Sequence, residues 1–336
     1  MTKTVAIEAK GLAKKYITKK RTSIFKSKVE VVEALKGISF NVKYGEVVGL
    51  LGPNGAGKTT TIKIIATLLR PDKGKVYIDG LDAFSNISII RRKLGIMLTV
   101  EKGFYPRLTG LENLEYFGVL YGLYGSKLKE RVNFLIKLLE LDSLNATTKL
   151  YEEFSLGMKA RLAFARALIH NPQILLLDEP TLGLDPISAR RIRSIVKDLA
   201  HKEGKAILYT THNMFEAEIV CDRILLINKG IIVAEGTPEE LKSKIPKLKI
   251  IKINIRNCIK ENVERVLSEI LGSDIKVKVE SVEGGLKVKI PVSKPEEVVS
   301  LVLKTFVKKN IDVINLSIEE PSLEDVFIYF AKGETS

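Results

Sequence analysis

Near its N-terminal end the chain reads Gly52-Pro53-Asn54-Gly55-Ala56-Gly57-Lys58-Thr59-Thr60. This is the spacing G-x-x-x-x-G-K-[ST] of a phosphate-binding loop, in which glycines let backbone N–H groups approach phosphate oxygens. In such a loop Lys58 reaches the β- and γ-phosphates of a nucleotide, and the Thr59 hydroxyl ligates Mg²⁺. The alternative is a glycine-rich turn that happens to lie beside a lysine.

The segments on either side of the loop argue against a simple turn. Residues 45–51 form a short apolar run typical of a buried strand, and residues 59–69 read as a helix. The positive N-terminal end of that helix would face a bound anion. Strand, loop and helix in this order predict an α/β nucleotide-binding domain.

Composition and charge limit the remaining possibilities. The 336 residues are 45% hydrophobic, which suffices for one large domain or two. No apolar run is long enough to span a membrane, and the N-terminus does not read as a signal peptide. The only cysteines are Cys221 and Cys258, so we expect no disulfide framework and a reducing, cytoplasmic compartment.

The net charge of +14 is unevenly distributed. Seven Lys and Arg residues and no acid lie from Lys14 to Lys28, whereas residues 245–336 hold fifteen bases and fourteen acids. The basic stretch suits contact with anionic lipid headgroups or nucleic acid, or it is a solvated loop. The change in charge is one sign of a domain boundary, which we place between residues 243 and 244.

Two more apolar runs end in residues that suit phosphate chemistry. The run 174–177 reads as a buried parallel strand followed by Asp178 and Glu179, and the run 206–211 is followed by His212. Parallel strands bring such side chains to the carboxyl edge of a sheet, where α/β proteins bind ligands. One carboxylate can support Mg²⁺ while the next polarises a water, and His212 can contact a γ-phosphate.

The other segments complete the expected architecture. Strands around the phosphate loop predict a small antiparallel layer, and Tyr16 stands at a distance suited to stacking on a base. Residues from about 82 to 160 read mainly as a helical subdomain, and Ser155 is a candidate N-cap for a helix over residues 160–169. From residue 244 onward, the order β-α-β-β-α-β predicts a ferredoxin-like unit.

Taken together, these motifs resemble the ATP-binding subunit of an ATP-binding cassette (ABC) transporter, in particular the subfamily of drug and sodium exporters. The resemblance covers residues 5–243, and residues 320–327 resemble the tail of those exporters' ATPases. It implies a P-loop NTPase fold, with a RecA-like core, an antiparallel β subdomain and a helical subdomain. A small C-terminal α+β domain would follow over residues 244–336.

The resemblance also implies roles for individual residues. Tyr16 would stack on adenine, Asp178 would support Mg²⁺ indirectly, and Asp185 would lie in the loop that joins two subunits. Glu179 would be the catalytic base and His212 the switch histidine. The signature, which contacts ATP bound to the other subunit, would be formed by Ser155, Leu156, Gly157 and Met158.

Two positions depart from the family pattern. The signature usually reads Leu-Ser-Gly-Gly-Gln, whereas this chain has Phe154-Ser155-Leu156-Gly157-Met158 and so keeps the serine and the second glycine. A glutamine is expected after the strand near residues 94–97. Thr99 or Glu101 falls nearest to that place.

The resemblance implies hydrolysis of ATP, with Mg²⁺, in a head-to-tail dimer that powers an export-type transporter. The integral membrane permease would be a separate chain, and this subunit would lie peripherally on the inner face of the cell membrane. The alternative is a soluble cassette protein of translation or repair, but this chain has one phosphate loop and no long coiled-coil insertion. Nucleic-acid binding is not favoured, because only Tyr16 and Phe25 interleave with the basic residues.

Overall fold

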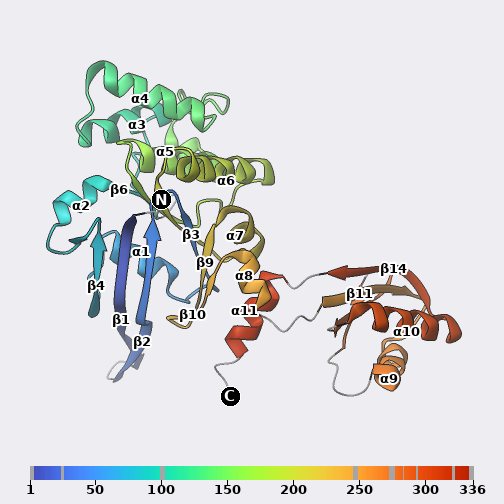
Figure 1. Ribbon diagram of the computed structural model, residues 1–336. Helices are drawn as coiled ribbons and strands as arrows, with labels where there is room; N and C mark the ends of the chain where they lie inside the picture. The colour runs from blue at the N-terminus through green and yellow to red at the C-terminus, as the bar shows by residue number, and fades with distance from the viewer. Residues whose placement is uncertain are drawn as a thin grey trace. The chain divides into compact units, whose positions relative to one another are not determined.

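The protein is described by a computed structural model, which forms two compact units, residues 1–238 and 239–336 (Figure 1). The structure describes residues 4–23, 26–98, 103–244, 249–271, 277–282, 284–292, 294–319 and 322–332, without the side chains of residues 18–30 and 331–332. The boundary between the units falls inside helix α8 (Pro238–Ser243).

A six-stranded sheet in the order β10-β9-β3-β8-β7-β6 forms the centre of the first unit. Every residue of β3, β7 and β8 is buried, which explains why these strands are continuous apolar runs without alternation. All neighbouring pairs are parallel except β9 with β10. The strands are β3 (Val47–Leu51), β6 (Leu94–Met97), β7 (Ile174–Asp178), β8 (Ala206–Thr211), β9 (Arg223–Asn228) and β10 (Ile231–Gly236).

Helices and a second sheet cover the central sheet. Helix α1 (Lys58–Ile65) contacts β7, while α6 (Pro186–His201) and α7 (Met214–Val220) contact β3 and β8. The second sheet is antiparallel in the order β2-β1-β4-β5, as predicted, and shares one hydrophobic core with α1 and the central sheet. Its strands are β1 (Val5–Ser23), β2 (Lys26–Lys43), β4 (Lys73–Ile78) and β5 (Leu81–Asp82).

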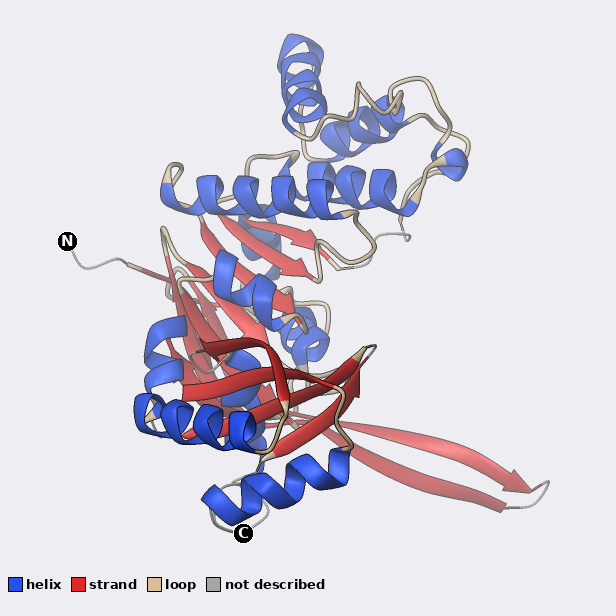
Figure 2. Cartoon of the chain, turned by 90° about the vertical axis from the view of Figure 1, so that its right-hand side faces the viewer, coloured by secondary structure: helices blue, strands red, loops and turns tan. Residues whose placement is uncertain are grey.

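Strands β1 and β2 are longer than the sequence pattern indicates. The pairing of β1 with β4 ends at Ala13, whereas its pairing with β2 continues to Ser23 opposite Lys26. Beyond Ala13 the hairpin is therefore a two-stranded ribbon, which extends away from its sheet in Figure 2. The basic stretch, for which a solvated loop was one of the alternatives drawn from the sequence, thus forms paired strands over most of its length.

The helical region contains α2 (Ile87–Lys93), α3 (Gly110–Leu120), α4 (Gly125–Leu138), the short 3₁₀ helix η1 (Tyr151–Glu153) and α5 (Leu156–Leu168). Strand β6 lies within the span expected to be mainly helical, and it belongs to the central sheet. Helix α5 begins four residues earlier than expected. The reason is that Ser155 is its N-cap, with Oγ accepting a hydrogen bond from Met158 N at 3.2 Å.

The second unit has the ferredoxin-like topology that the element order predicts. Its antiparallel sheet runs β12-β13-β11-β14, and alternate residues of β13 are buried in a core shared with α9 and α10. The elements are β11 (Lys249–Arg256), α9 (Lys260–Leu271), β12 (Lys278–Val282), β13 (Gly285–Val292), α10 (Pro295–Lys308), β14 (Asp312–Glu319) and α11 (Leu323–Lys332).

Candidate active site

The phosphate loop joins β3 to α1 and surrounds a buried lysine. Lys58 Nζ donates to the carbonyl oxygens of Gly52 at 2.7 Å and Pro53 at 3.3 Å. A Cβ atom at Gly52 would lie 2.1 Å from the carbonyl oxygen of Ile227, so only glycine fits there. Gly57 has a φ of +113°, a conformation that favours glycine, and a Cβ atom there would lie 2.7 Å from the carbonyl oxygen of Ala34.

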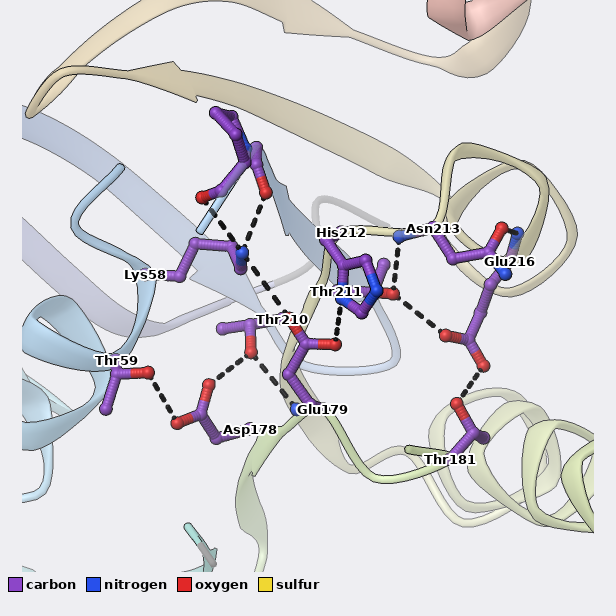
Figure 3. A network of polar contacts seen from close by, with 12 residues as sticks. Lys58, Thr59, Asp178, Glu179, Thr181, Thr210, Thr211, His212, Asn213 and Glu216 are labelled. Carbon is purple, nitrogen blue, oxygen red and sulfur yellow. Dashed lines mark hydrogen bonds and ion pairs between the residues drawn. The ribbon is translucent and has the colours of Figure 1, made fainter. Parts of the chain in front are cut away.

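Asp178 connects the first turn of α1 to the central sheet (Figure 3). Its Oδ2 atom accepts a hydrogen bond from Thr59 Oγ1 at 2.8 Å, and its Oδ1 atom accepts one from Thr210 Oγ1 at 2.5 Å. Carboxylate and hydroxyl oxygens are ligands suited to Mg²⁺, which also takes phosphate oxygens from a nucleotide. Among the described residues no group of three or more His, Cys, Asp and Glu could hold a metal ion.

Glu179 follows Asp178 in a strained backbone conformation. Its φ is +52°, which is unfavourable for any residue with a Cβ atom by about 1–2 kcal/mol. The backbone N–H of Glu179 donates to both the carbonyl oxygen and Oγ1 of Thr210, at 3.1 and 3.2 Å. Strain that neighbouring hydrogen bonds maintain is often found at functional sites.

The Glu179 carboxylate lies between two groups that the sequence also selected. One oxygen is 3.4 Å from Lys58 Nζ, and the other is 2.7 Å from Nδ1 of His212 (Figure 3). The His212 side chain is 46% exposed, whereas that of Glu179 is 19% exposed. Strands β7 and β8 are paired neighbours, and this brings the two side chains together at the carboxyl edge of the sheet.

A cavity of about 520 Å³ opens beside these groups. Tyr16 lies at the same cavity as the phosphate loop, and its hydroxyl is 3.5 Å from Thr60 Oγ1. The lining residues are Tyr16, Val32, Ala34, Pro53, Asn54, Gly55, Gly57, Lys58, Thr59, Thr60, Glu179, Leu182 and His212. A phosphate loop and an aromatic ring at one cavity suit a nucleotide, whose phosphates and base need different partners.

The signature residues lie elsewhere on the chain. Ser155 to Met158 form the start of α5, and neither they nor Asp185 are among the residues that line the cavity. Leu156 packs against Gly183. A Cβ atom added at Gly183 would lie 2.1 Å from the Cδ2 atom of Leu156. Asp185 is the N-cap of α6, and hydrogen bonds from the side chain and backbone of Ser188 lower the pKa of its carboxyl group.

Two of the sequence-based predictions, the glutamine equivalent and the basic stretch, fall wholly or partly on residues that the structure does not describe. Thr99 and Glu101 lie outside the described residues, as do the side chains of the basic stretch from residue 18 onward. The first two bases of that stretch form ion pairs, Lys14 with Asp72 at 2.7 Å and Lys15 with Glu33 at 2.6 Å.

Several residues that shape the site were not selected from the sequence. Thr210 binds both Asp178 and the backbone of Glu179, and Glu216 accepts hydrogen bonds from Thr181 and Thr211. Thr210 could have been found from the sequence, because it and Thr211 form a pair of threonines directly before His212. Glu216 stands on a short helix without any motif, so only the tertiary structure connects it to the site.

The fold and this geometry define a P-loop nucleotide hydrolase. Two family models match the chain, "ABC transporter" over residues 35–182 and "ATP-binding protein DrrA1-3-like, C-terminal domain" over residues 236–331. The linearmycin resistance ATP-binding protein LnrL of Bacillus subtilis is 37% identical over 294 residues, covering 88% of this chain and 92% of its own. The daunorubicin/doxorubicin resistance ATP-binding protein DrrA of Streptomyces peucetius is 38% identical over 276 residues, which cover 81% of this chain and 77% of that protein.

A solved structure agrees with these relatives. The dimeric post-hydrolysis state of the ATP-binding cassette MJ0796, bound to ADP and Pi, matches with a TM-score of 0.61 and 30% identity over 69% of this chain and 98% of that one. The chain therefore belongs to the family of ABC transporter ATP-binding subunits that includes DrrA, NatA and BcrA. This confirms the resemblance, the fold class and the ATPase assignment drawn from the sequence. None of the described helices has the length and apolar character needed to cross a membrane.

Proposed function

We propose that this subunit hydrolyses ATP, with Mg²⁺, in a head-to-tail dimer and thereby drives an export-type transporter whose membrane-spanning subunit is a separate chain. The observation that carries the proposal is the convergence of Lys58, Asp178, Glu179 and His212 beside one cavity. The names of relatives support export, since they include linearmycin resistance, bacitracin transport and daunorubicin/doxorubicin resistance proteins. The subunit would then work peripherally, on the inner face of the membrane.

The geometry suits attack of water on a γ-phosphate. Glu179 would accept the proton of the attacking water, and His212, in contact with the same carboxylate, would hold it in place and face the γ-phosphate. Lys58 would exchange its contacts with loop carbonyl oxygens for contacts with phosphate oxygens. Mg²⁺, when bound, supplies positive charge to the phosphates, and Thr59 and Asp178 are the residues that would hold it.

The position of the signature supports a shared site. Ser155 and Gly157 lie at the N-terminal end of α5, where the helix dipole favours an anion such as phosphate, yet they do not line the cavity of their own chain. In a head-to-tail dimer each nucleotide would lie between Lys58 of one subunit and Ser155 of the other. Asp185, on the loop that packs beside the signature through Gly183, would then lie near the subunit interface.

Complementation between two inactive variants tests this arrangement. Lys58→Ala should damage the site formed by its own phosphate loop, and Ser155→Arg should damage the opposite site. A mixed dimer collects both lesions in one site and leaves the other intact. Mixing the two variants should therefore restore part of the ATPase activity, and tagged purification should recover it with the mixed species.

The absence of rescue, with mixed dimers demonstrated by cross-linking, would contradict the shared site. Single-turnover measurement on the mixed dimer separates this outcome from strict coupling between two sites. Transport is tested separately, by co-purification with an integral membrane subunit and assay of the reconstituted pair. Recovery as a stable complex with ribosomes or DNA instead would favour an assembly factor over an exporter.

A further inference from the structure

The most buried carboxylate near the site belongs to Glu216 on α7, a residue that is 3% exposed. It does not line the cavity, and in Figure 3 it lies to the right of Glu179 and His212. Its Oε1 atom accepts a hydrogen bond from Thr181 Oγ1 at 2.5 Å, and its Oε2 atom accepts one from Thr211 Oγ1 at 2.9 Å. The Arg193 guanidinium of α6 lies 3.7 Å from Oε1 and offsets the buried charge.

The two threonines belong to the two chain segments that leave the site. Thr181 stands two residues after Glu179, on the loop that leads to Asp185, and Thr211 directly precedes His212. Thr211 Oγ1 also accepts a hydrogen bond from Asn213 N at 3.0 Å, so the backbone is fixed on both sides of His212. One carboxylate thus connects the segment that carries the proposed base to the segment that carries the histidine.

This connection matters because His212 is poorly held by packing. Its side chain is 46% exposed, and among the residues that the structure describes its ring forms a hydrogen bond with Glu179 alone. The direction of the ring therefore depends on the backbone at residues 211–213. A displacement of about 1 Å in a reacting group can reduce a rate about 100-fold.

We propose that Glu216 is a positioning residue that fixes His212 against Glu179 and links this pair to the loop over residues 181–185 of the same chain. The inference rests on the proposed roles of Glu179 and His212. A carboxylate suits the task because it only accepts, and both of its partners are donating hydroxyls. A glutamine of the same shape would replace one accepting oxygen by an NH₂ donor, so one of the two threonine hydroxyls would lose its acceptor.

The kinetic test compares Glu216→Gln with Glu218→Gln, an exposed position on the same helix. We expect Glu216→Gln to reduce the single-turnover rate of ATP hydrolysis by about 10- to 100-fold, as loss of a supporting hydrogen bond does in other sites. Affinity for ATP should change little, because Glu216 does not line the cavity. The Glu218→Gln control should hydrolyse ATP like the parent.

A second readout separates positioning from a general loss of structure. The chain contains only three histidines, so the ring resonances of His170, His201 and His212 can be resolved by NMR. In Glu216→Gln without nucleotide, the His212 resonance should move while the other two stay. Thr181→Val, which removes one hydroxyl on the other side of the carboxylate, should move the same resonance.

An unchanged hydrolysis rate, or an unmoved His212 resonance in folded Glu216→Gln, overturns the inference. If Glu216→Gln does not fold, Thr181→Val decides by the same criterion. The histidine spectrum does not require hydrolysis, so it tests the inference even if the proposed mechanism fails. Conversely, full activity of Glu179→Gln would contradict the proposed function. The positioning role of Glu216 would then be decided by the His212 resonance alone.

Discussion

The Nδ1 atom of His212 lies 2.7 Å from Oε2 of Glu179, across 33 positions of sequence. Pairing of β7 with β8 sets Asp178 opposite Thr210, and each strand contributes the polar residue that follows it. This contact places an exposed imidazole beside a carboxylate that also faces Lys58.

Replacing Glu179 by Gln should keep ATP binding and abolish most hydrolysis. The amide has the shape of the carboxylate but cannot accept a proton from water, and loss of a positioned base reduces rates by about 10²–10⁴-fold. Steady-state hydrolysis and equilibrium ATP binding measure the two effects, and size-exclusion chromatography should show an ATP-dependent dimer. Turnover close to that of the parent would exclude Glu179 as the base.

Removing the ring of Tyr16 should raise the ATP concentration needed for half-maximal rate more than it lowers the maximal rate. Stacking stabilises the ground and transition states alike, and stacking on an aromatic is worth about 1–3 kcal/mol per base in other systems. Tyr16→Ala should show the effect, and Tyr16→Phe should not, because the hydroxyl makes only a long contact with Thr60. If Tyr16→Ala bound ATP as tightly as Tyr16→Phe and the parent, Tyr16 would be an ordinary surface residue.

Two glycines of the phosphate loop form a matched pair for stability. Gly55 and Gly57 both have positive φ, +80° and +113°, so alanine strains either one by about 1–2 kcal/mol. A Cβ atom at Gly57 would lie 2.7 Å from the carbonyl oxygen of Ala34, whereas nothing lies within 4 Å at Gly55. Urea unfolding should therefore show Gly57→Ala to be less stable than Gly55→Ala, by about 1–3 kcal/mol for the overcrowding. Equal losses would mean that the loop moves to make room.

His170 should make the protein less stable as the pH falls. Its ring stacks on Tyr121 with 3.9 Å between centroids, and burial lowers its pKa to about 4 from an ordinary value of 6.5. Between those two pH values the unfolded chain binds more protons than the folded chain, so folding stability is lost as pH falls through this window. His170→Phe keeps an aromatic ring for the stack and removes the titration.

Urea unfolding at pH 7 and pH 4.5 measures this effect. The parent should lose more stability between the two pH values than His170→Phe does. The same loss in both proteins would assign the pH dependence to other groups.

Much of the architecture is contained in local sequence. The phosphate loop could be identified because its glycines and Lys58 act within a few residues, where spacing alone sets the geometry. The runs 174–177 and 206–211 are buried on both faces of the sheet, so continuous apolar sequence was enough to predict them. The second unit was predictable because apolar and polar residues alternate along β13, as expected of a strand with one face buried and the other partly exposed.

The tertiary structure decided which of these residues meet. Tyr16 lines the cavity because β1 lies beside the phosphate loop. The ribbon of β1 and β2 forms because these two strands remain paired beyond the point where β1 stops pairing with β4. Glu216 had no sequence signal, since a single carboxylate on a seven-residue helix has no periodic pattern. Its hydrogen bonds join residues 5 and 35 positions away, and such contacts depend on how strands and helices pack rather than on local spacing.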